Sequence, residues 1–220
     1  MSRVIFFLIL GFSGLAVLIY LGIWQMQRLE WKTNLLAEID LRMAQDPVAI
    51  PKNPTKAKDN FRRVEFEGTL LGIEAHVLTS ERNTGPGYKI VAGAAAPGTR
   101  ILIDLGFVPL EAKDATRFGA VKVVGNLYWP NETDPKFTPN PDFDENIFFA
   151  RNLFQMASFV DTQQILVVAT EIEQDFETIP QRVAHNLPNN HLEYAITWFG
   201  LAAVWAAMTG YALVKTRRTA

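Results

Sequence analysis

Two uncharged apolar runs constrain this chain more than any other feature of its sequence. One covers residues 4–24 and reads VIFFLILGFSGLAVLIYLGIW, and the other covers residues 194–214 and reads YAITWFGLAAVWAAMTGYALV. A helix of about 20 apolar residues crosses the hydrocarbon core of a bilayer. We therefore predict transmembrane helices at 4–24 and 191–214, with a domain at 45–190 between them and a basic tail at 215–220.

The first run has a second possible interpretation, the apolar part of a cleaved signal peptide. The run is longer than the apolar region of about 7–15 residues in such signals, and no A-x-A-like cleavage site follows it. We therefore expect an uncleaved anchor. Apolar residues continue at helical spacing over 25–44, so this helix is predicted to extend past the membrane to about residue 44.

Basic residues next to the apolar runs predict the orientation of the chain. Lys215, Arg217 and Arg218 follow the second run without an acidic neighbour. Arg28 and Lys32, which follow the first run, weakly favour the opposite orientation. Lys and Arg beside membrane helices stay on the cytoplasmic side. We expect both termini in the cytoplasm. Because no transit-like leader precedes the first run, we expect a bacterial inner membrane and a periplasmic central domain.

The central region contains short apolar segments separated by Gly- and Pro-rich turns. Strands are predicted at 62–70, 75–80, 88–95, 100–104, 121–127, 147–151 and 164–169, with a helical turn at 154–159. Turn signals every 8–12 residues or so are typical of a sandwich or a barrel. The predicted fold class is an α+β membrane protein, in which two transmembrane helices flank an extracytoplasmic β-rich domain that is barrel- or sandwich-like.

Composition and missing motifs exclude several classes of function. The chain has no cysteine, which excludes disulfides and Cys-ligated zinc or iron–sulfur clusters. Its net charge of −2 argues against a nucleic-acid surface. The sequence has no G-x-S-x-G, H-E-x-x-H or P-loop motif. We expect a protein that is not an enzyme, and we interpret the acidic residues Asp142, Asp144 and Glu145 as solvated surface.

His191 is the candidate ligand among the three histidines. His76 lies in a strand-like run and His185 in a polar loop, and we expect both to be satisfied or exposed. Asn190 and Glu193 have the spacing of a helix capping box, which places His191 in the first helical turn. The positive end of the helix dipole disfavours an imidazolium there. A neutral imidazole can ligate a metal, and His is a common axial ligand of haem iron.

Aromatic residues follow His191 on one predicted helical face. Tyr194, Trp198, Leu201 and Trp205 succeed it at steps of three and four residues. Such a face could hold a flat apolar macrocycle such as haem. The alternative is that the face packs on the first apolar helix.

Small residues recur in both apolar runs at helix-packing spacing. They are Gly11 and Gly14 in the first run and Ala202, Ala206 and Gly210 in the second. Stripes of this kind allow two membrane helices to approach closely. The alternative is that they reflect only the usual composition of membrane helices.

Several short motifs occur in a fixed order along the chain. They read WQ at 24–25, WK at 31–32, FRRV at 61–64, GT at 68–69, GY at 87–88, GFVP at 106–109, PNNHL at 188–192 and TWFG at 197–200. This ordered set resembles the Surfeit locus protein 1 family of cytochrome c oxidase assembly factors over nearly the whole chain. Leu70, Leu105 and Phe107 depart from the family pattern, in which an aromatic, Arg and Trp are usual.

The resemblance implies a chaperone role in building haem–copper oxidase. It implies that the protein receives haem a from haem A synthase, binds it transiently and helps to place it in oxidase subunit I. His191 matches the family's histidine and is thereby implied as an axial ligand of the haem iron, beside Asn190, Tyr194 and Trp198. If the family's Arg meets a haem propionate or a partner carboxylate, Leu105 lacks that contact. The alternative is a scaffold that stabilises subunit I without contacting haem.

Overall fold

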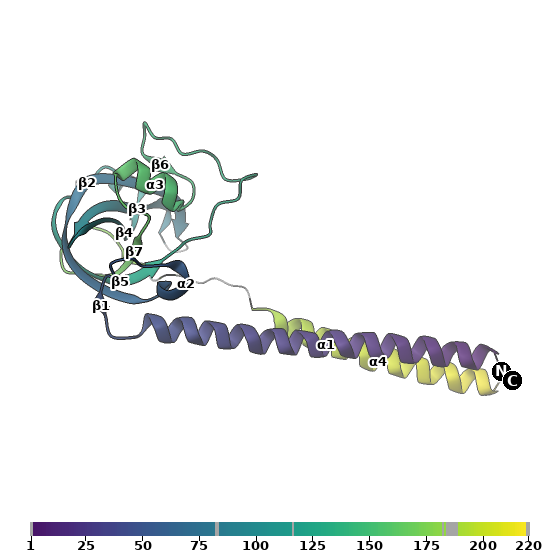
Figure 1. The fold of residues 1–220 in the computed structure, drawn as a ribbon. Helices are drawn as coiled ribbons and strands as arrows, with labels where there is room; N and C mark the ends of the chain where they lie inside the picture. Colours follow the sequence, from purple (N-terminus) through teal and green to yellow (C-terminus); the bar gives the residue numbers. More distant parts are fainter. Residues whose placement is uncertain (1, 82–83, 116, 182, 184–188, 219–220) are drawn as a thin grey trace. The chain divides into compact units, whose positions relative to one another are not determined.

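The computed structural model describes residues 2–81, 84–115, 117–181, 183 and 189–218. The chain divides into a helical unit, Met1–Glu38 with Asn186–Ala220, and a β-rich unit, Ile39–His185 (Figure 1). Helix α1 (Ser2–Met43) runs from the first unit into the second, and α4 (His191–Arg218) belongs to the helical unit. The prediction of two apolar helices flanking a β-rich domain is confirmed.

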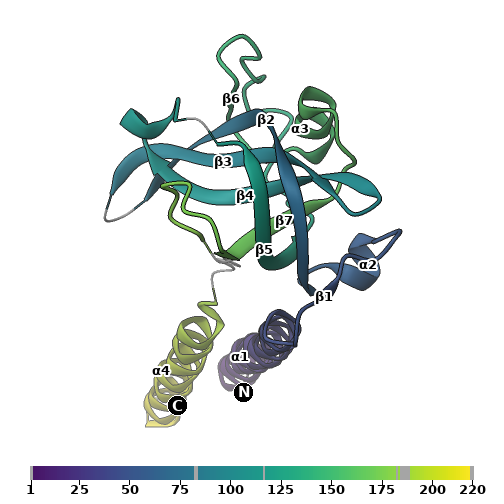
Figure 2. The same ribbon diagram turned by 90° about the vertical axis from the view of Figure 1, so that its left-hand side faces the viewer.

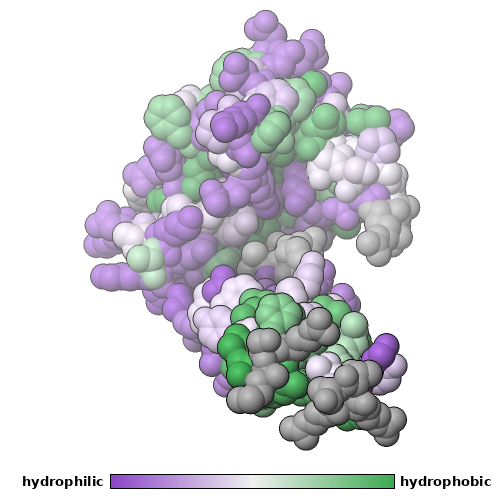
Figure 3. Space-filling model, turned by 90° about the vertical axis from the view of Figure 1, so that its right-hand side faces the viewer, coloured by the Kyte–Doolittle hydropathy of each residue, from purple (hydrophilic) through white to green (hydrophobic). Residues whose placement is uncertain are grey.

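Helices α1 and α4 of the helical unit lie side by side, with both chain termini at the same end (Figure 1). Both are long and apolar enough to cross a membrane. Many of their large apolar side chains are exposed, including Phe12 at 69% and Tyr211 at 70%. Green, hydrophobic side chains are prominent on the helical unit in Figure 3, whereas the visible face of the β-rich unit is mostly purple. The exposure of so many large apolar side chains is unfavourable in water.

Two glycines of α1 permit the close approach of α4. A methyl group added at Gly14 would lie 2.6 Å from the ring of Trp205, and one at Gly11 would lie 2.2 Å from a methyl of Thr209. Side chains of α4 thus fill the space that the missing Cβ atoms leave. For these two residues, the structure agrees with the packing interpretation of the small-residue stripe.

The small residues of α4 are used differently from the prediction. Ala195 and Ala202 are buried, whereas Ala206 is exposed and no atom of the described residues lies within 4 Å of a methyl group added at Gly210. Ala195 and Ala202 are seven residues apart and so share one helical face. The contact side of α4 is therefore rotated away from the stripe that the spacing suggested.

Five of the described strands close into a barrel. They are β2 (Arg63–Glu81), β3 (Gly85–Ala96), β4 (Thr99–Pro109), β5 (Gly119–Tyr128) and β7 (Leu166–Ile172). The order is β2-β3-β4-β7-β5, and β5 pairs back with β2. Only the β4–β7 pair in this ring is parallel. Figure 2 shows the strands crossing around the closed sheet, so the domain is a barrel rather than a sandwich.

A bend in β2 makes this closure possible. The pairing register shifts between Leu70 and Glu74, and Gly72 lies between them with φ +75°. The first half of β2 pairs with β5 and the second half pairs with β3. The predicted strands at 62–70 and 75–80 are therefore one strand, because a bulge bends a strand without ending it.

The barrel has an apolar interior and a second apolar cluster on its outer surface. Ile101, Ile103 and Leu105 of β4 belong to the interior, whereas Leu102 belongs to the outer cluster. Helix α3 (Leu153–Val160) contributes Met156, Ala157 and Val160 to that outer cluster. Because both faces of β4 are covered, this strand is apolar almost throughout rather than alternating.

Several short elements complete the β-rich unit. Strands β1 (Val48–Ala49) and β6 (Ile147–Phe148) pair in parallel with β2, and α2 (Lys56–Asp59) and the 3₁₀ turn η1 (Leu110–Ala112) lie in connections. The sequence analysis did not predict β1, α2 or η1. The strand predicted at 147–151 is only two residues long, and α3 contains the predicted helical turn at 154–159.

Candidate functional site

His191 is the first residue of α4. Asn190 directly precedes it, and the backbone carbonyl of Asn190 accepts a hydrogen bond from the amide of Tyr194 at 3.2 Å. Glu193 lies in the first turn, where a carboxylate is favourable to the helix dipole. The imidazole is thus carried by a regular helical turn rather than by a loose loop.

The imidazole of His191 is bound to the other helix of the unit. Its Nδ1 lies 2.8 Å from Oε1 of Gln25 in α1. Gln25 is only 8% exposed. An amide oxygen can only accept, so Nδ1 donates its hydrogen and a neutral ring keeps its lone pair on Nε2. Partners of this kind orient histidines that bind metals.

The aromatic face predicted below the histidine is divided in the structure. Tyr194 is 56% exposed and Leu201 is also exposed, whereas Trp198 and Trp205 are half-buried. The indole N–H of Trp205 donates to the carbonyl of Gly11 in α1 at 3.0 Å. For Trp205, the structure therefore agrees with the alternative interpretation, packing on the first helix. Tyr194 and Trp198 are the aromatic residues left near the histidine.

Gln25 is the site residue that the sequence analysis did not identify. Its pairing with His191 joins residues 166 positions apart, which no local pattern reveals. The available signal was a polar side chain directly after an uncharged apolar run, within the WQ motif at 24–25. A buried amide at that position needs a hydrogen-bond partner.

His76 lies in β2 and is buried in the β-rich unit. Its Nε2 is 3.3 Å from Glu74, whose carboxylate also accepts from Arg117 at 3.0 Å. Nδ1 of His76 has no hydrogen-bond partner among the described residues. His76 is therefore a buried histidine satisfied on one side only. The third histidine, His185, lies outside the described residues.

The acidic residues of the 142–145 loop are used to shape a turn. One oxygen of Asp142 accepts from the backbone amides of Asp144 and Glu145 at 3.1 and 3.2 Å. Glu145 also pairs with Lys113 at 3.4 Å. Across the described parts of the chain, no group of three or more His, Asp or Glu side chains could hold a metal ion.

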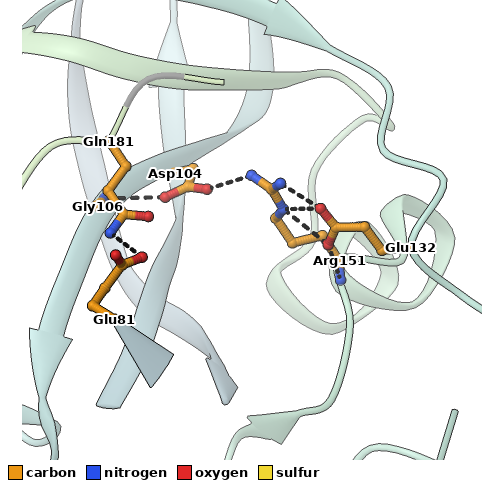
Figure 4. Close-up of polar contacts among 6 residues, drawn as sticks. All are labelled: Glu81, Asp104, Gly106, Glu132, Arg151 and Gln181. Atoms are coloured by element: carbon orange, nitrogen blue, oxygen red, sulfur yellow. Dashed lines mark hydrogen bonds and ion pairs between the residues drawn. The ribbon is translucent and has the colours of Figure 1, made fainter. Parts of the chain in front are cut away.

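An ionic network of two buried residues, Arg151 and Asp104, and the exposed Glu132 joins the long 129–150 connection to the barrel (Figure 4). Arg151 lies between two carboxylates, at 2.8 Å from Asp104 and in a bidentate pair with Glu132. Burial alone would lower the pKa of Arg151 and raise that of Glu132. Their hydrogen bonds and opposite charges outweigh burial, so the pKa of Arg151 is raised and that of Glu132 is lowered. The second carboxylate, Asp104, also accepts from the amide of Gly106 at 3.0 Å.

Comparison with known proteins gives the family. The model of the SURF1 family matches residues 13–203. The chain belongs to the SURF1 family. Surfeit locus protein 1 of Xenopus tropicalis is 29% identical over 213 residues, which cover 83% of this chain and 68% of the relative. Surfeit locus protein 1 of Homo sapiens is 28% identical, covering 83% and 69%, and a SURF1-like protein of Monosiga brevicollis is 28% identical, covering 86% and 80%.

SURF1 proteins are known as oxidase assembly factors and form no known enzyme class. The SURF1 match includes Gln25 and His191 together with the whole barrel. The resemblance inferred from the ordered motifs is therefore confirmed.

The three positions at which the sequence is expected to depart from the family pattern are buried positions of the β-rich unit. Leu70, Leu105 and Phe107 are all buried. The ring of Phe107 covers Gly87, where an added methyl group would lie 2.5 Å from it. In this chain these side chains pack the core, and Leu105 presents no charge to a ligand.

Proposed function

We propose that this chain is a membrane-bound assembly factor of cytochrome c oxidase that holds haem a transiently, with His191 as an axial ligand. The observation that carries the proposal is the hydrogen bond between His191 Nδ1 and the buried Gln25. A neutral imidazole oriented through one nitrogen has a lone pair for iron on the other. Membership of an oxidase-assembly family supports haem a as the cargo.

The residues around His191 suit an amphipathic ring. Tyr194 is exposed and Trp198 is half-buried in the next turn of α4, so both can contribute apolar area. Asn190 offers a polar side chain to the acidic edge of the ring and is exposed. Haem a supplies an iron with an axial position that one imidazole can fill. In this proposal the protein binds, orients and shields the ring and does no chemistry on it.

The proposal places α1 and α4 in a bacterial inner membrane. The exposed apolar side chains of both helices support it, as does the basic tail that begins at Lys215. Both termini are then cytoplasmic and the barrel is periplasmic. Haem A synthase is the proposed donor of haem a, and oxidase subunit I is the proposed acceptor.

A single histidine suits a ligand that must be passed on. One axial bond gives modest affinity, and an acceptor site that offers its own histidines can outcompete it. The direction of transfer then follows from the number of axial bonds at each site.

The test is the visible spectrum of the full-length protein, purified in detergent from cells that make haem a. We expect a haem band in the unchanged protein, which is lost or shifted in His191→Ala. Leu192→Ala is the matched control, because Leu192 is the adjacent, exposed residue. Equal haem content and spectrum in all three proteins would refute the ligand assignment.

A second candidate function is a scaffold that stabilises subunit I without touching haem. The observation that favours it is the bond from Trp205 to α1, which withdraws one aromatic from the proposed haem face. The scaffold predicts co-purification with subunit I in cells whose haem a synthesis is blocked. It also predicts no haem band under any condition, which separates it from the first proposal.

A further inference from the structure

One hydrogen bond in the helical unit joins a buried amide to the proposed iron ligand. Gln25 lies on the side of α1 that α4 covers, and its carbonyl oxygen is 2.8 Å from His191 Nδ1. Ala195, one turn after the histidine, is buried at 1% exposure. Small residues of this kind permit two helices to pack closely.

The direction of this hydrogen bond decides which nitrogen can bind a ligand. Neutral histidine has two tautomers, and the one with hydrogen on Nε2 is the commoner in the free amino acid. The oxygen of Gln25 accepts only, so it selects the tautomer with hydrogen on Nδ1. This leaves the lone pair on Nε2, the nitrogen farther from the backbone.

We propose that Gln25 is the positioning residue of His191, which sets its tautomer and ring orientation before any haem arrives. The inference rests on the proposed function for its purpose, but the hydrogen bond and the tautomer exist without haem. Gln25 does not touch the iron and acts only through the imidazole. Loss of such a partner typically costs about 10–100-fold in metal affinity.

The chemistry of an amide also fits a site that must release its cargo. A carboxylate on Nδ1–H makes an imidazole more electron-rich and strengthens its bond to a metal. The neutral amide of Gln25 orients the ring but makes it less electron-rich than a carboxylate would. We therefore expect Gln25→Glu to bind haem more tightly and to release it more slowly.

The first experiment uses the full-length protein in lipid nanodiscs, without haem and with ¹⁵N-labelled histidine. Long-range ¹H–¹⁵N spectra distinguish the two neutral tautomers, and His191→Ala assigns the signal. We expect the Nδ1–H form in the unchanged protein and in Gln25→Glu. In Gln25→Leu we expect a shift toward the Nε2–H form. Gln27→Leu is the matched control, because Gln27 lies two residues along α1 and is exposed.

The second experiment measures haem dissociation and the haem midpoint potential. It uses the unchanged protein and the variants Gln25→Leu, Gln25→Glu and Gln27→Leu. We expect a roughly 10–100-fold weaker complex for Gln25→Leu, no change for Gln27→Leu, and a lower potential with slower release for Gln25→Glu. An Nε2–H tautomer in the unchanged protein would overturn the inference. If no protein binds haem but the tautomer responds to Gln25 as expected, the positioning role stands and the proposed function fails.

Discussion

At the scale of single residues, the buried side chain of Arg151 holds an ion pair whose loss should destabilise the fold strongly. Its partners Asp104 and Glu132 would be left without their counter-charge in Arg151→Leu. Breaking a buried pair by removing one partner costs about 3–5 kcal/mol. We expect a loss of that size in the free energy of unfolding, measured by urea denaturation of the full-length protein in detergent.

The matched control for this prediction is a second arginine in an ion pair. Arg100 pairs with Asp161 on the surface, where both side chains are mostly exposed. Exposed pairs contribute about 0–1 kcal/mol, so Arg100→Ala should change stability little. Equal losses in both variants would mean that burial does not determine how much the ion pairs of Arg151 contribute to the free energy of unfolding.

The pKa of Glu132 predicts how this stabilisation depends on pH. Because the folded protein lowers that pKa below 4.5, the stabilisation is present above the unfolded value. It is lost as the pH falls through the folded value. Glu132→Gln should therefore be less stable than the unchanged protein at pH 7, and the difference should shrink below about pH 4.5. Urea midpoints between pH 3 and pH 7, about the range in which carboxylates titrate, measure this difference.

At the scale of elements, the bulge at Gly106 determines how β4 meets the segment around Ile179. Gly106 has φ +114°, and an added methyl group would lie 2.2 Å from the carbonyl oxygen of Ile179. In Gly106→Ala, the new methyl group would overlap the backbone of Ile179 and the backbone at residue 106 would be strained. We expect the free energy of unfolding to fall by about 3 kcal/mol or more. Gly119 has φ +102°, and in the part of the chain that the structure describes no atom lies within 4 Å of a methyl group added there. Gly119→Ala should cost only the strain, about 1–3 kcal/mol, by the same urea measurement.

The contact between α1 and α4 can be tested by cross-linking. A Cβ added at Gly11 lies 3.2 Å from Cβ of Thr209, and the chain has no cysteine of its own. Gly11→Cys with Thr209→Cys should form a disulfide on oxidation in the membrane. Adding Gly14→Leu should prevent it, because that side chain would overlap the ring of Trp205.

The control for the cross-link is Gly200→Leu, because none of the described residues has an atom within 4 Å of a methyl group added at Gly200. It should leave the disulfide yield unchanged. A yield that survives Gly14→Leu would show that the glycine is not required for the helix contact.

At the scale of the whole molecule, the proposed orientation predicts which side of the membrane each part faces. Single cysteines can be placed at the exposed Lys136 in the β-rich unit and at Thr219 in the basic tail. In intact spheroplasts, a membrane-impermeant thiol reagent should label the first and not the second. Labelling of the tail but not of residue 136 would reverse the proposed topology.

Local patterns along the chain were sufficient to predict several features of the fold and of the candidate site. Uncharged runs predicted both helices, because a span needs only length and apolarity. Turn signals and short apolar segments predicted most strands, and helix-start spacing singled out His191. The Surfeit resemblance also came from short motifs in order. Each apolar run, strand segment, helix start and single motif is complete within about 20 neighbouring residues, and the resemblance needed only the order of the motifs.

Only the tertiary structure decided which distant residues meet. It joined two predicted strands into one bent β2 that closes the barrel, and it paired Gln25 with His191 across the helical unit. It turned Trp205 toward α1 and buried Arg151 between two carboxylates. The physical reason is that hydrogen bonds, ion pairs and close packing depend on proximity in space. Residue type and spacing record that proximity only for neighbours along a helix or a strand.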